Sequence, residues 1–217
     1  MPVRSVLAAA TPLYRIGRTP DPLAWPPRAF AGGGRYDDPG GEFVVLYAAE
    51  QRRGAFVETL APFRPAVADL ALAQRLPDGD PSDRMPPAGV IPATFFRRRI
   101  AAFRVETPGP WLDVRAPETH QALRSELAEP LVALGYGARF VWGDALGHDH
   151  RLTQIIARWA FDHRFQGLVY SSCHDAKLDC WALFDGAIIS PVGESVAIGV
   201  DDPDCRSVAA LFQLTFR

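Results

Sequence analysis

The sequence has few cysteines and no long apolar run. Its three cysteines, Cys173, Cys180 and Cys205, cannot all pair, and 217 residues are enough to bury a core without disulfides. We therefore expect free thiols in a reducing compartment. The opening residues MPVRSVLAAATPL are too weakly apolar for a signal peptide, and no run approaches the length of a membrane span. These absences predict a cytoplasmic protein with no membrane partner.

The sequence also lacks a strong excess of charge of either sign. Its formal net charge is -2, so no overall field attracts nucleic acid, and we expect no direct binding to nucleic acid. The basic run FFRRRIAAFR at 95–104 alternates with apolar residues, as in a two-faced strand. With 48% hydrophobic and 22% charged residues, the composition is that of an ordinary globular protein. The length fits a single domain over residues 1–217.

Several well-known catalytic patterns are missing. GGGR at 32–35 matches neither the phosphate loop G-x-x-x-x-G-K-[ST] nor a G-x-G-x-x-G turn between a strand and a helix. The stretches GHDH (147–150) and CHDAKLDC (173–180) lack the ligand spacing of zinc sites, so we expect no metal. No G-x-S-x-G elbow surrounds Ser171 and Ser172, although a triad with a distant histidine stays open.

The hydrophobic patterns predict strands mixed with helices, without regular alternation. Strands are expected at 12–17, 42–49, 94–106, 111–115, 167–172 and 180–185. Helices are expected at 50–63, 116–134 and 149–165, the last with an apolar face of Leu152, Ile155, Ile156, Trp159 and Ala160. The Pro-rich segment 76–93 is predicted to be a long loop, and 186–217 to be a C-terminal extension with a final element in SVAALFQLTFR. This mixture indicates an α+β fold.

The stretch AFAGGGRYDDPGGEFVVLYAAE at 29–50 places Arg35 in an open backbone just before an apolar strand. Glycines make that backbone permissive, and a planar guanidinium suits bidentate contact with a pyrophosphate. A solvated turn explains the same residues locally, because turns gather Gly and Asp. Glu58 is equally ambiguous, since it points away from the apolar stripe of its helix and so is typical of a surface residue.

Four stretches, taken in order, resemble the RES-domain family, which is named for its Arg, Glu and Ser. They are LYRIG with Arg15, GGRYDDP with Arg35 and Tyr36, VLYAAEQRRGAFVETL with Tyr47 and Glu58, and GLVYSSCHD with Ser172, followed by CWALFD. The helix containing RLTQIIARWAF also fits the family's layout. Each motif is short, and the ordered set carries the likeness over about residues 12–185.

The resemblance implies an α+β fold similar to ADP-ribosyltransferases, with a mixed sheet core, flanking helices and chemistry on NAD. Characterised members degrade NAD by hydrolysis or phosphorolysis, or ADP-ribosylate a protein, and many are toxins paired with Xre-type antitoxins. The chain is therefore expected to cleave NAD as its substrate, with water or phosphate as acceptor, and to be the toxin of a toxin–antitoxin pair. A protein ADP-ribosyltransferase using the same site, and a non-catalytic partner-binding domain with the same fold, are the alternatives.

The same resemblance implies ligand contacts for residues in the first half of the chain. Arg35 and Arg15 would hold the NAD pyrophosphate or an incoming phosphate. Tyr36 would stack on a flat ring, and Tyr47 would line the nicotinamide ribose pocket.

Catalysis is expected, again by resemblance, to centre on a carboxylate and a serine. Glu58 would hydrogen-bond a ribose hydroxyl and stabilise the oxocarbenium-like charge as nicotinamide leaves. Ser172 would orient the nicotinamide ribose or Glu58, with Ser171 beside it in the NAD site. The family often has an arginine after its serine, where this chain has Cys173.

Overall fold

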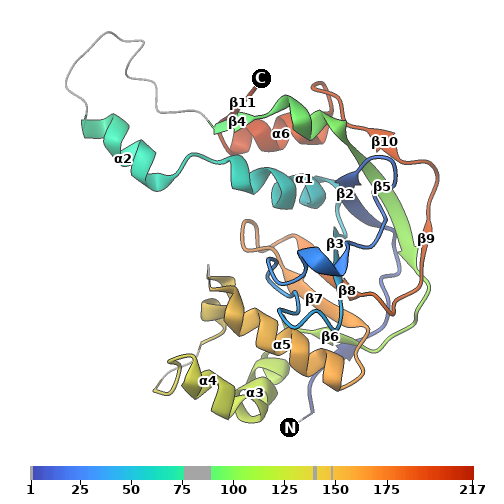
Figure 1. The fold of residues 1–217 in the computed structure, drawn as a ribbon, viewed down its shortest axis with the longest axis vertical. Helices are drawn as coiled ribbons and strands as arrows, with labels where there is room; N and C mark the ends of the chain where they lie inside the picture. Colours follow the sequence, from blue (N-terminus) through green and yellow to red (C-terminus); the bar gives the residue numbers. More distant parts are fainter. Residues whose placement is uncertain (1, 76–88, 139–140, 148) are drawn as a thin grey trace.

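The computed structural model describes residues 2–75, 89–138, 141–147 and 149–217, and it confirms an α+β architecture (Figure 1). The strands are β1 (Ser5–Val6), β2 (Leu13–Arg18), β3 (Val45–Ala49), β4 (Gly89–Ile91), β5 (Arg98–Val105), β6 (Trp111–Asp113), β7 (Gly167–Ser171), β8 (Asp179–Phe184), β9 (Ile189–Pro191), β10 (Val196–Ala197) and β11 (Leu214–Phe216). The α-helices are α1 (Arg52–Leu60), α2 (Val67–Arg75), α3 (Pro117–Glu126), α4 (Ala128–Ala133), α5 (His150–Asp162) and α6 (Pro203–Leu211). Short 3-10 helices are η1 (Arg28–Phe30), η2 (Ala61–Phe63), η4 (Ala93–Arg97) and η5 (Trp142–Leu146).

One large mixed sheet organises the fold. Its strand order is β1-β6-β7-β8-β3-β2-β5-β10, with β9 also pairing with β5, and β4 and β11 form a separate parallel pair. Among the strand pairs of the large sheet that the structure describes, β6 with β7 is parallel and the others are antiparallel. Both faces are buried: along β3, Val45 and Ala49 belong to one apolar cluster, and Leu46 and Ala48 to the other. Burial on both faces explains why this strand is apolar throughout.

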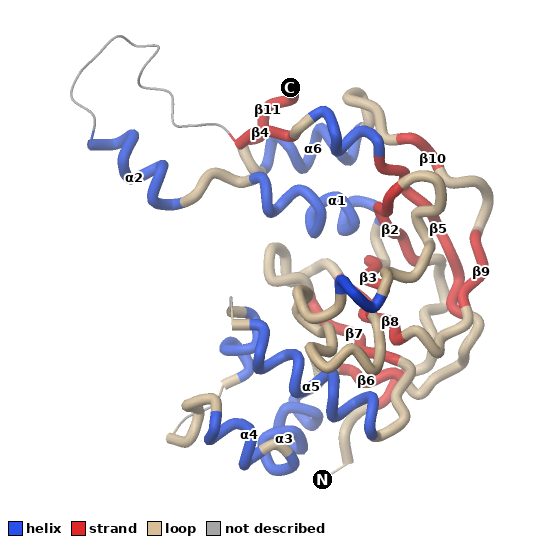
Figure 2. The backbone as a smooth tube through the Cα atoms, viewed as in Figure 1, coloured by secondary structure: helices blue, strands red, loops and turns tan. Residues whose placement is uncertain are grey.

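Apart from α2, which extends away from the other helices in Figure 1, the helices lie in two groups beside the large sheet. Figure 1 shows α1 with α6 towards one end of the molecule and α3, α4 and α5 towards the other, and Figure 2 shows the strands of the large sheet gathered along one side of both groups. Phe56 and Leu60 of α1 share a core cluster with Leu152 and Ile156 of α5. The two helical groups therefore border the same face of the sheet.

The predicted helices are found, with one interruption. The apolar face of α5 is confirmed, since Leu152, Ile156 and Ala160 are fully buried or nearly so, and the Asp149 carboxylate caps the helix by accepting from Arg151 N at 3.0 Å. The expected helix at 116–134 is instead two helices, α3 and α4, broken at Leu127. Pro130 explains the break, because proline has no N–H for the Glu126 carbonyl and clashes with it.

The segment 76–93 departs from the predicted loop at its end. Residues 76–88 lie outside the described residues, but 89–91 form β4 and 93–97 form η4, so the loop prediction is wrong there. The strand prediction at 94–106 is likewise too long at its start, because β5 begins at Arg98. β4 pairs with β11, close to the end of the chain. A local pattern rich in proline gives no sign of so distant a partner.

The residues after 185 are built into the body of the protein. β9 and β10 pair with β5 at the edge of the large sheet. Asp202 caps α6, and it also accepts from Arg52 of α1, with Arg52 Nη2 2.5 Å from Asp202 Oδ2. The ion pair therefore joins the start of α1 to the start of α6.

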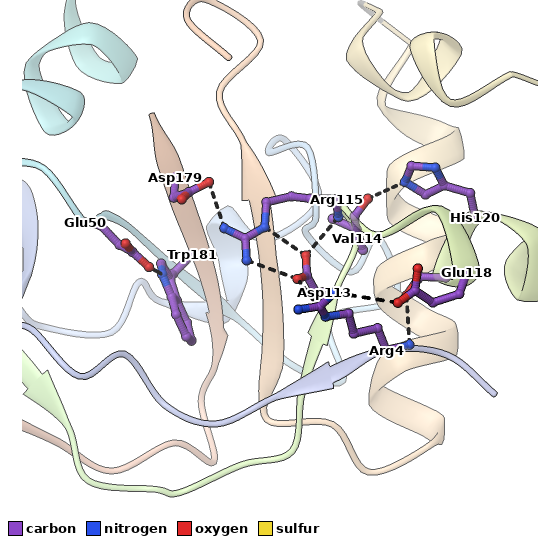
Figure 3. Close-up of polar contacts among 10 residues, drawn as sticks. Arg4, Glu50, Asp113, Val114, Arg115, Glu118, His120, Asp179 and Trp181 are labelled. Carbon is purple, nitrogen blue, oxygen red and sulfur yellow. Dashed lines mark hydrogen bonds and ion pairs between the residues drawn. The ribbon is translucent and has the colours of Figure 1, made fainter. Parts of the chain in front are cut away.

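A charged network fixes the ends of β6, β7 and β8 (Figure 3). Asp113, which is 4% exposed, accepts from Arg115 Nε at 2.8 Å and from Arg115 Nη2 at 3.1 Å. Arg115 Nη1 lies 2.8 Å from Asp179 Oδ1 in β8, and Arg4 Nε lies 3.8 Å from Asp113 Oδ2. Since Asp179 pairs with Ser171 of β7, the network holds the base of the β7–β8 loop.

We expect Arg115→Ala to lower the free energy of unfolding by about 2 kcal/mol, because the buried Asp113 carboxylate loses its main donor. Burial acts to raise the pKa of Asp113, but the hydrogen bonds from Arg115 outweigh it and lower that pKa below its ordinary 3.8. A lowered native pKa stabilises the fold above pH 3.8, and this contribution is lost as the pH falls through the native pKa. The deficit of the variant should therefore shrink in acid, as urea unfolding at about pH 7 and about pH 3 can measure.

Arg206→Ala is the matched control for this substitution. Arg206 pairs with Asp201 at 3.3 Å, but their side chains are 64% and 87% exposed. Exposed ion pairs contribute little to stability. Equal losses from the two substitutions would contradict the role given to Asp113.

Candidate active site

A cleft of about 800 Å³ is lined by residues from α1 on one side and from the start of α5 on the other. Its ionisable lining residues are Tyr14, Arg15, Arg35, Tyr47, Glu58, Arg64, His150, Tyr170, Cys173 and His174. A second groove, of about 440 Å³, is lined mainly by apolar residues and has Asp21 as its only charged lining residue. Because chemistry needs convergent polar groups, the larger cleft is the candidate site.

Glu58 reaches the cleft from α1, whose other side packs into the core. Gly54 lets α1 lie close to β3, since a Cβ at this position would meet Ala49 Cβ at 2.9 Å. Glu58 is half-buried and lines the cleft, and its Oε1 accepts a hydrogen bond from Ser172 Oγ at 2.5 Å. Burial raises the pKa of the Cys180 thiol, and the nearby negative charge of Glu58 raises it further.

Ser172, rather than Ser171, meets Glu58. Ser172 is 3% exposed, and its Oγ also accepts from His174 N at 3.1 Å. Ser171 lies one residue earlier, half-buried in β7 opposite Asp179. Neither serine lines the cleft. Ser172 is therefore the serine of this pair that contacts the Glu58 carboxylate.

Arg35 enters the cleft from the glycine-rich loop and is held by neutral acceptors. Its Nη1 donates to Ala145 O at 2.7 Å and to Gly147 O at 3.1 Å, and its Nη2 lies 3.5 Å from Cys173 Sγ. Burial raises the pKa of the Cys173 thiol, and the positive charge of Arg35 acts in the opposite direction. These carbonyl groups do not compensate the positive charge of the guanidinium.

Arg15 lies where β2 and β3 separate, since the two strands share a single residue pair. Its Nη1 donates to Tyr47 O at 2.9 Å, and its Nε donates to Pro22 O at 3.0 Å. Burial, followed by repulsion from Arg98, lowers the pKa of Arg15 to about 10. The guanidinium thus stays charged at neutral pH, and a nearby anion would offset both effects by favouring the charged form.

The cleft carries more positive than negative charge. Arg15, Arg35 and Arg64 line it, and Glu58 is its only lining carboxylate. Within the described residues, none of the three arginines forms an ion pair with a carboxylate. Arg64 Cζ lies instead 5.0 Å from the centroid of the Phe212 ring. A concave wall with unneutralised guanidinium groups attracts an anion.

The two tyrosines of the family motifs have different positions. Tyr47 lines the cleft, but its hydroxyl donates to Asp37 Oδ1 at 2.8 Å and accepts from Tyr36 N at 2.9 Å. Burial, and then the charge of Asp37, raise the pKa of Tyr47 well above its ordinary value. Tyr36 is 2% exposed, and its ring centroid lies 4.7 Å from that of Tyr170. The structure therefore places the Tyr36 ring in the core, away from the position that stacking on a ligand requires.

Three residues at or near the cleft are not predicted as site residues from the sequence: Arg64, Tyr170 and Asp37. Arg64 follows η2 and reaches the cleft beside Phe212, a contact that no local pattern signals. Asp37 lies inside the GGRYDDP motif, where an aspartate between glycine and proline is explained by turn formation alone.

The sequence predicts no metal site at 147–150 or 173–180, the two histidine-containing stretches. Among the described residues, no three of His, Cys, Asp and Glu are grouped so as to hold a metal ion. His148 lies outside those residues.

None of the described helices is both long enough and apolar enough to cross a membrane.

Comparisons with known proteins place this geometry in context. The family model described as RES domain matches residues 12–204. A chain of the crystal structure of the M. tuberculosis MbcT–MbcA toxin–antitoxin complex is similar in fold, with a TM-score of 0.56 and 15% identity. The alignment covers 96% of this chain and 90% of that one, and it supports the predicted mixed sheet with flanking helices. No curated protein matches the sequence.

Proposed function

The chain belongs to the RES-domain family, and from this premise we propose that it cleaves the bond between nicotinamide and ribose in NAD. The observation that carries the proposal is a cleft in which one carboxylate, Glu58, accompanies three arginines that have no carboxylate partner among the residues the structure describes. The pyrophosphate of NAD suits the guanidinium groups. The ribose, which becomes cationic as nicotinamide leaves, suits the carboxylate.

In the proposed reaction the N-glycosidic bond breaks and its electron pair goes to nicotinamide. Nicotinamide was cationic in NAD and departs as a neutral molecule, so no strong general acid is needed. Glu58 stabilises the oxocarbenium-like ribose through its negative charge and a hydrogen bond to a ribose hydroxyl. Water or phosphate then adds to C1″ of this ribose, and the proton released by the acceptor goes to solvent.

The supporting residues follow from the contacts above. Ser172 holds one carboxylate oxygen of Glu58, which fixes the direction of the charge that the ribose meets. Arg35 and Arg15 keep unused N–H donors for the pyrophosphate or an incoming phosphate, because their observed acceptors occupy only part of each guanidinium. Tyr47 lines the same cleft.

We also propose that the protein is the toxin of a toxin–antitoxin pair with an Xre-type antitoxin. Two observations support this role: membership of the RES-domain family, and the likeness in fold to a chain of a toxin–antitoxin complex. A helix-turn-helix protein of the Xre type encoded beside this chain would strengthen the proposal.

The test is to incubate the purified protein with NAD, with and without phosphate, and to follow free nicotinamide and the ribose product by mass. We expect nicotinamide release, with ADP-ribose from hydrolysis or its 1″-phosphate from phosphorolysis. Labelled NAD added to a cell lysate tests whether proteins, the third class of acceptor, are modified. A labelled protein as the main product would replace the proposal by protein ADP-ribosyltransfer, and failure to bind NAD at all would favour a non-catalytic partner-binding domain.

A further inference from the structure

We propose that Gln154 of α5 is a positioning residue that clamps the glycine loop Gly32–Arg35 and so fixes Arg35 in the cleft. The inference rests on the proposed NAD site and extends it to a side chain that does not line the cleft. Gln154 is a polar residue in the middle of a core helix, where an apolar residue is the ordinary choice.

The amide of Gln154 spans the loop from the α5 side. Its Nε2 donates to Gly32 O at 3.0 Å and to Gly34 O at 3.1 Å, and the residue is 8% exposed. Both amide hydrogens are thus used on carbonyls two residues apart. The neighbouring Thr153 Oγ1 donates to Arg35 O, which extends the clamp to the arginine itself.

The loop is held on its other side as well. Asp37 Oδ2 accepts from Gly34 N at 2.7 Å, while Asp37 Oδ1 accepts from the Tyr47 hydroxyl. A Cβ at Gly34 would meet Asp37 Oδ1 and Tyr47 Oη, both at 2.6 Å, whereas a Cβ at Gly33 would meet nothing within 4 Å. The backbone at Gly34 is therefore enclosed between α5 and β3.

A clamp of this kind restricts a glycine-rich loop, whose backbone otherwise has many accessible conformations. Gly32, with φ at +96°, adopts a conformation that L side chains rarely take, and an unrestrained glycine backbone samples many others. Fixing the loop before the ligand arrives removes that ordering cost from binding. Loss of the clamp should therefore weaken the grip of Arg35 on the ligand and leave the chemical step at Glu58 largely intact.

Cys173 provides a readout of Arg35 position that needs no NAD turnover. Its thiol lies 3.5 Å from Arg35 Nη2; burial raises the pKa of this thiol, and the positive charge of Arg35 opposes that rise. Cys173 is exposed, whereas Cys180 and Cys205 are buried, so alkylation of the folded protein reports on Cys173. Movement of Arg35 away from the thiol raises its pKa and shifts the pH profile of alkylation upward.

The decisive variant is Gln154→Glu, which replaces two donors by acceptors facing the carbonyls of Gly32 and Gly34. We expect its Cys173 alkylation profile to move to higher pH, towards that of Arg35→Ala. We also expect KM for NAD to rise about ten-fold, with kcat changed by less than about three-fold. Since a protonated glutamic acid regains one donor, the rise in KM should diminish near about pH 5.

Three further variants complete the experiment. Gln154→Met removes both donors without adding charge and should shift the Cys173 profile in the same direction. Gln121→Glu makes the same chemical change on the exposed face of α3, and it should keep the wild-type profile. Gly34→Ala should shift the profile, whereas Gly33→Ala should not.

The outcomes separate the clamp from the enzymatic activity. A wild-type Cys173 profile in both Gln154 variants, with circular dichroism and unfolding midpoints showing folded protein, overturns the proposal. If no variant and no wild-type sample cleaves NAD, the proposed function fails, yet the Cys173 profiles still decide whether Gln154 positions Arg35.

Discussion

Glu58→Gln lowers kcat for NAD cleavage by about a hundred- to a thousand-fold, the range found when a preorganised group that stabilises transition-state charge is removed. Glutamine keeps the size and can still accept from Ser172 Oγ, so the local hydrogen bond survives and the negative charge does not. Because the positive charge moves onto the ribose beside Glu58 only in the transition state, and glutamine can still accept a hydrogen bond from the ribose, KM should change less than kcat. Steady-state nicotinamide release over a range of NAD concentrations gives both constants.

Glu126→Gln is the matched control for the loss of a carboxylate. Glu126 lies exposed at the end of α3, away from the residues that line the cleft. It should retain the wild-type kcat. A Glu58→Gln enzyme with wild-type kcat would remove Glu58 from the reaction.

Arg35→Ala raises KM for NAD by about ten- to a hundred-fold, as expected for losing one or two charge-assisted hydrogen bonds to the pyrophosphate. Arg15 and Arg64 remain in the cleft, so binding should be weakened but not abolished. Arg35→Lys keeps the charge without the planar fork and should fall between alanine and the wild type. KM from initial rates, together with calorimetric titration of NAD into the Glu58→Gln background, measures the effect.

Arg35 also bonds Ala145 and Gly147, so its removal needs a control for folding. Urea unfolding of Arg35→Ala reports any loss of stability, and Arg206→Ala provides an arginine truncation at an exposed pair. An unchanged KM in a folded Arg35→Ala protein would contradict the anion-binding role of this arginine.

Most of the helices and strands could be predicted from the sequence, because the hydrophobic patterns that indicate them are local. The apolar face of α5 and the doubly buried β3 are visible in residue order alone. The interruption at Leu127 was also accessible, since Pro130 cannot continue a helix. The strand β4 could not be predicted from its own residues, because its partner β11 lies more than a hundred residues later in the sequence.

For the candidate site, the ordered motifs indicate which residues belong to it, but not how the fold surrounds each of them. They named Glu58 and Ser172, which the fold brings within 2.5 Å, and Arg15 and Arg35, which both line the cleft. They also named Tyr36, whose ring the fold packs against Tyr170 in the core. Which side of a loop a ring takes depends on tertiary packing, and a motif does not contain that information.

The residues that support the site could not be predicted from the sequence for the same reason. Gln154 and Asp37 act through the backbone of a loop, so neither has the spacing of a catalytic motif. Their contacts also change the meaning of the glycine-rich stretch. The backbone around Arg35 is open in sequence, but in the structure it is held between α5 and β3.

The most direct measurement of the central claim is nicotinamide release from NAD by the wild-type protein and by the Glu58→Gln, Arg35→Ala double variant, assayed side by side at equal concentration. The account predicts continuous release by the wild type and release at the uncatalysed rate by the folded double variant. Equal release from the two proteins, or none from either with water, phosphate or lysate proteins as acceptors, would contradict it.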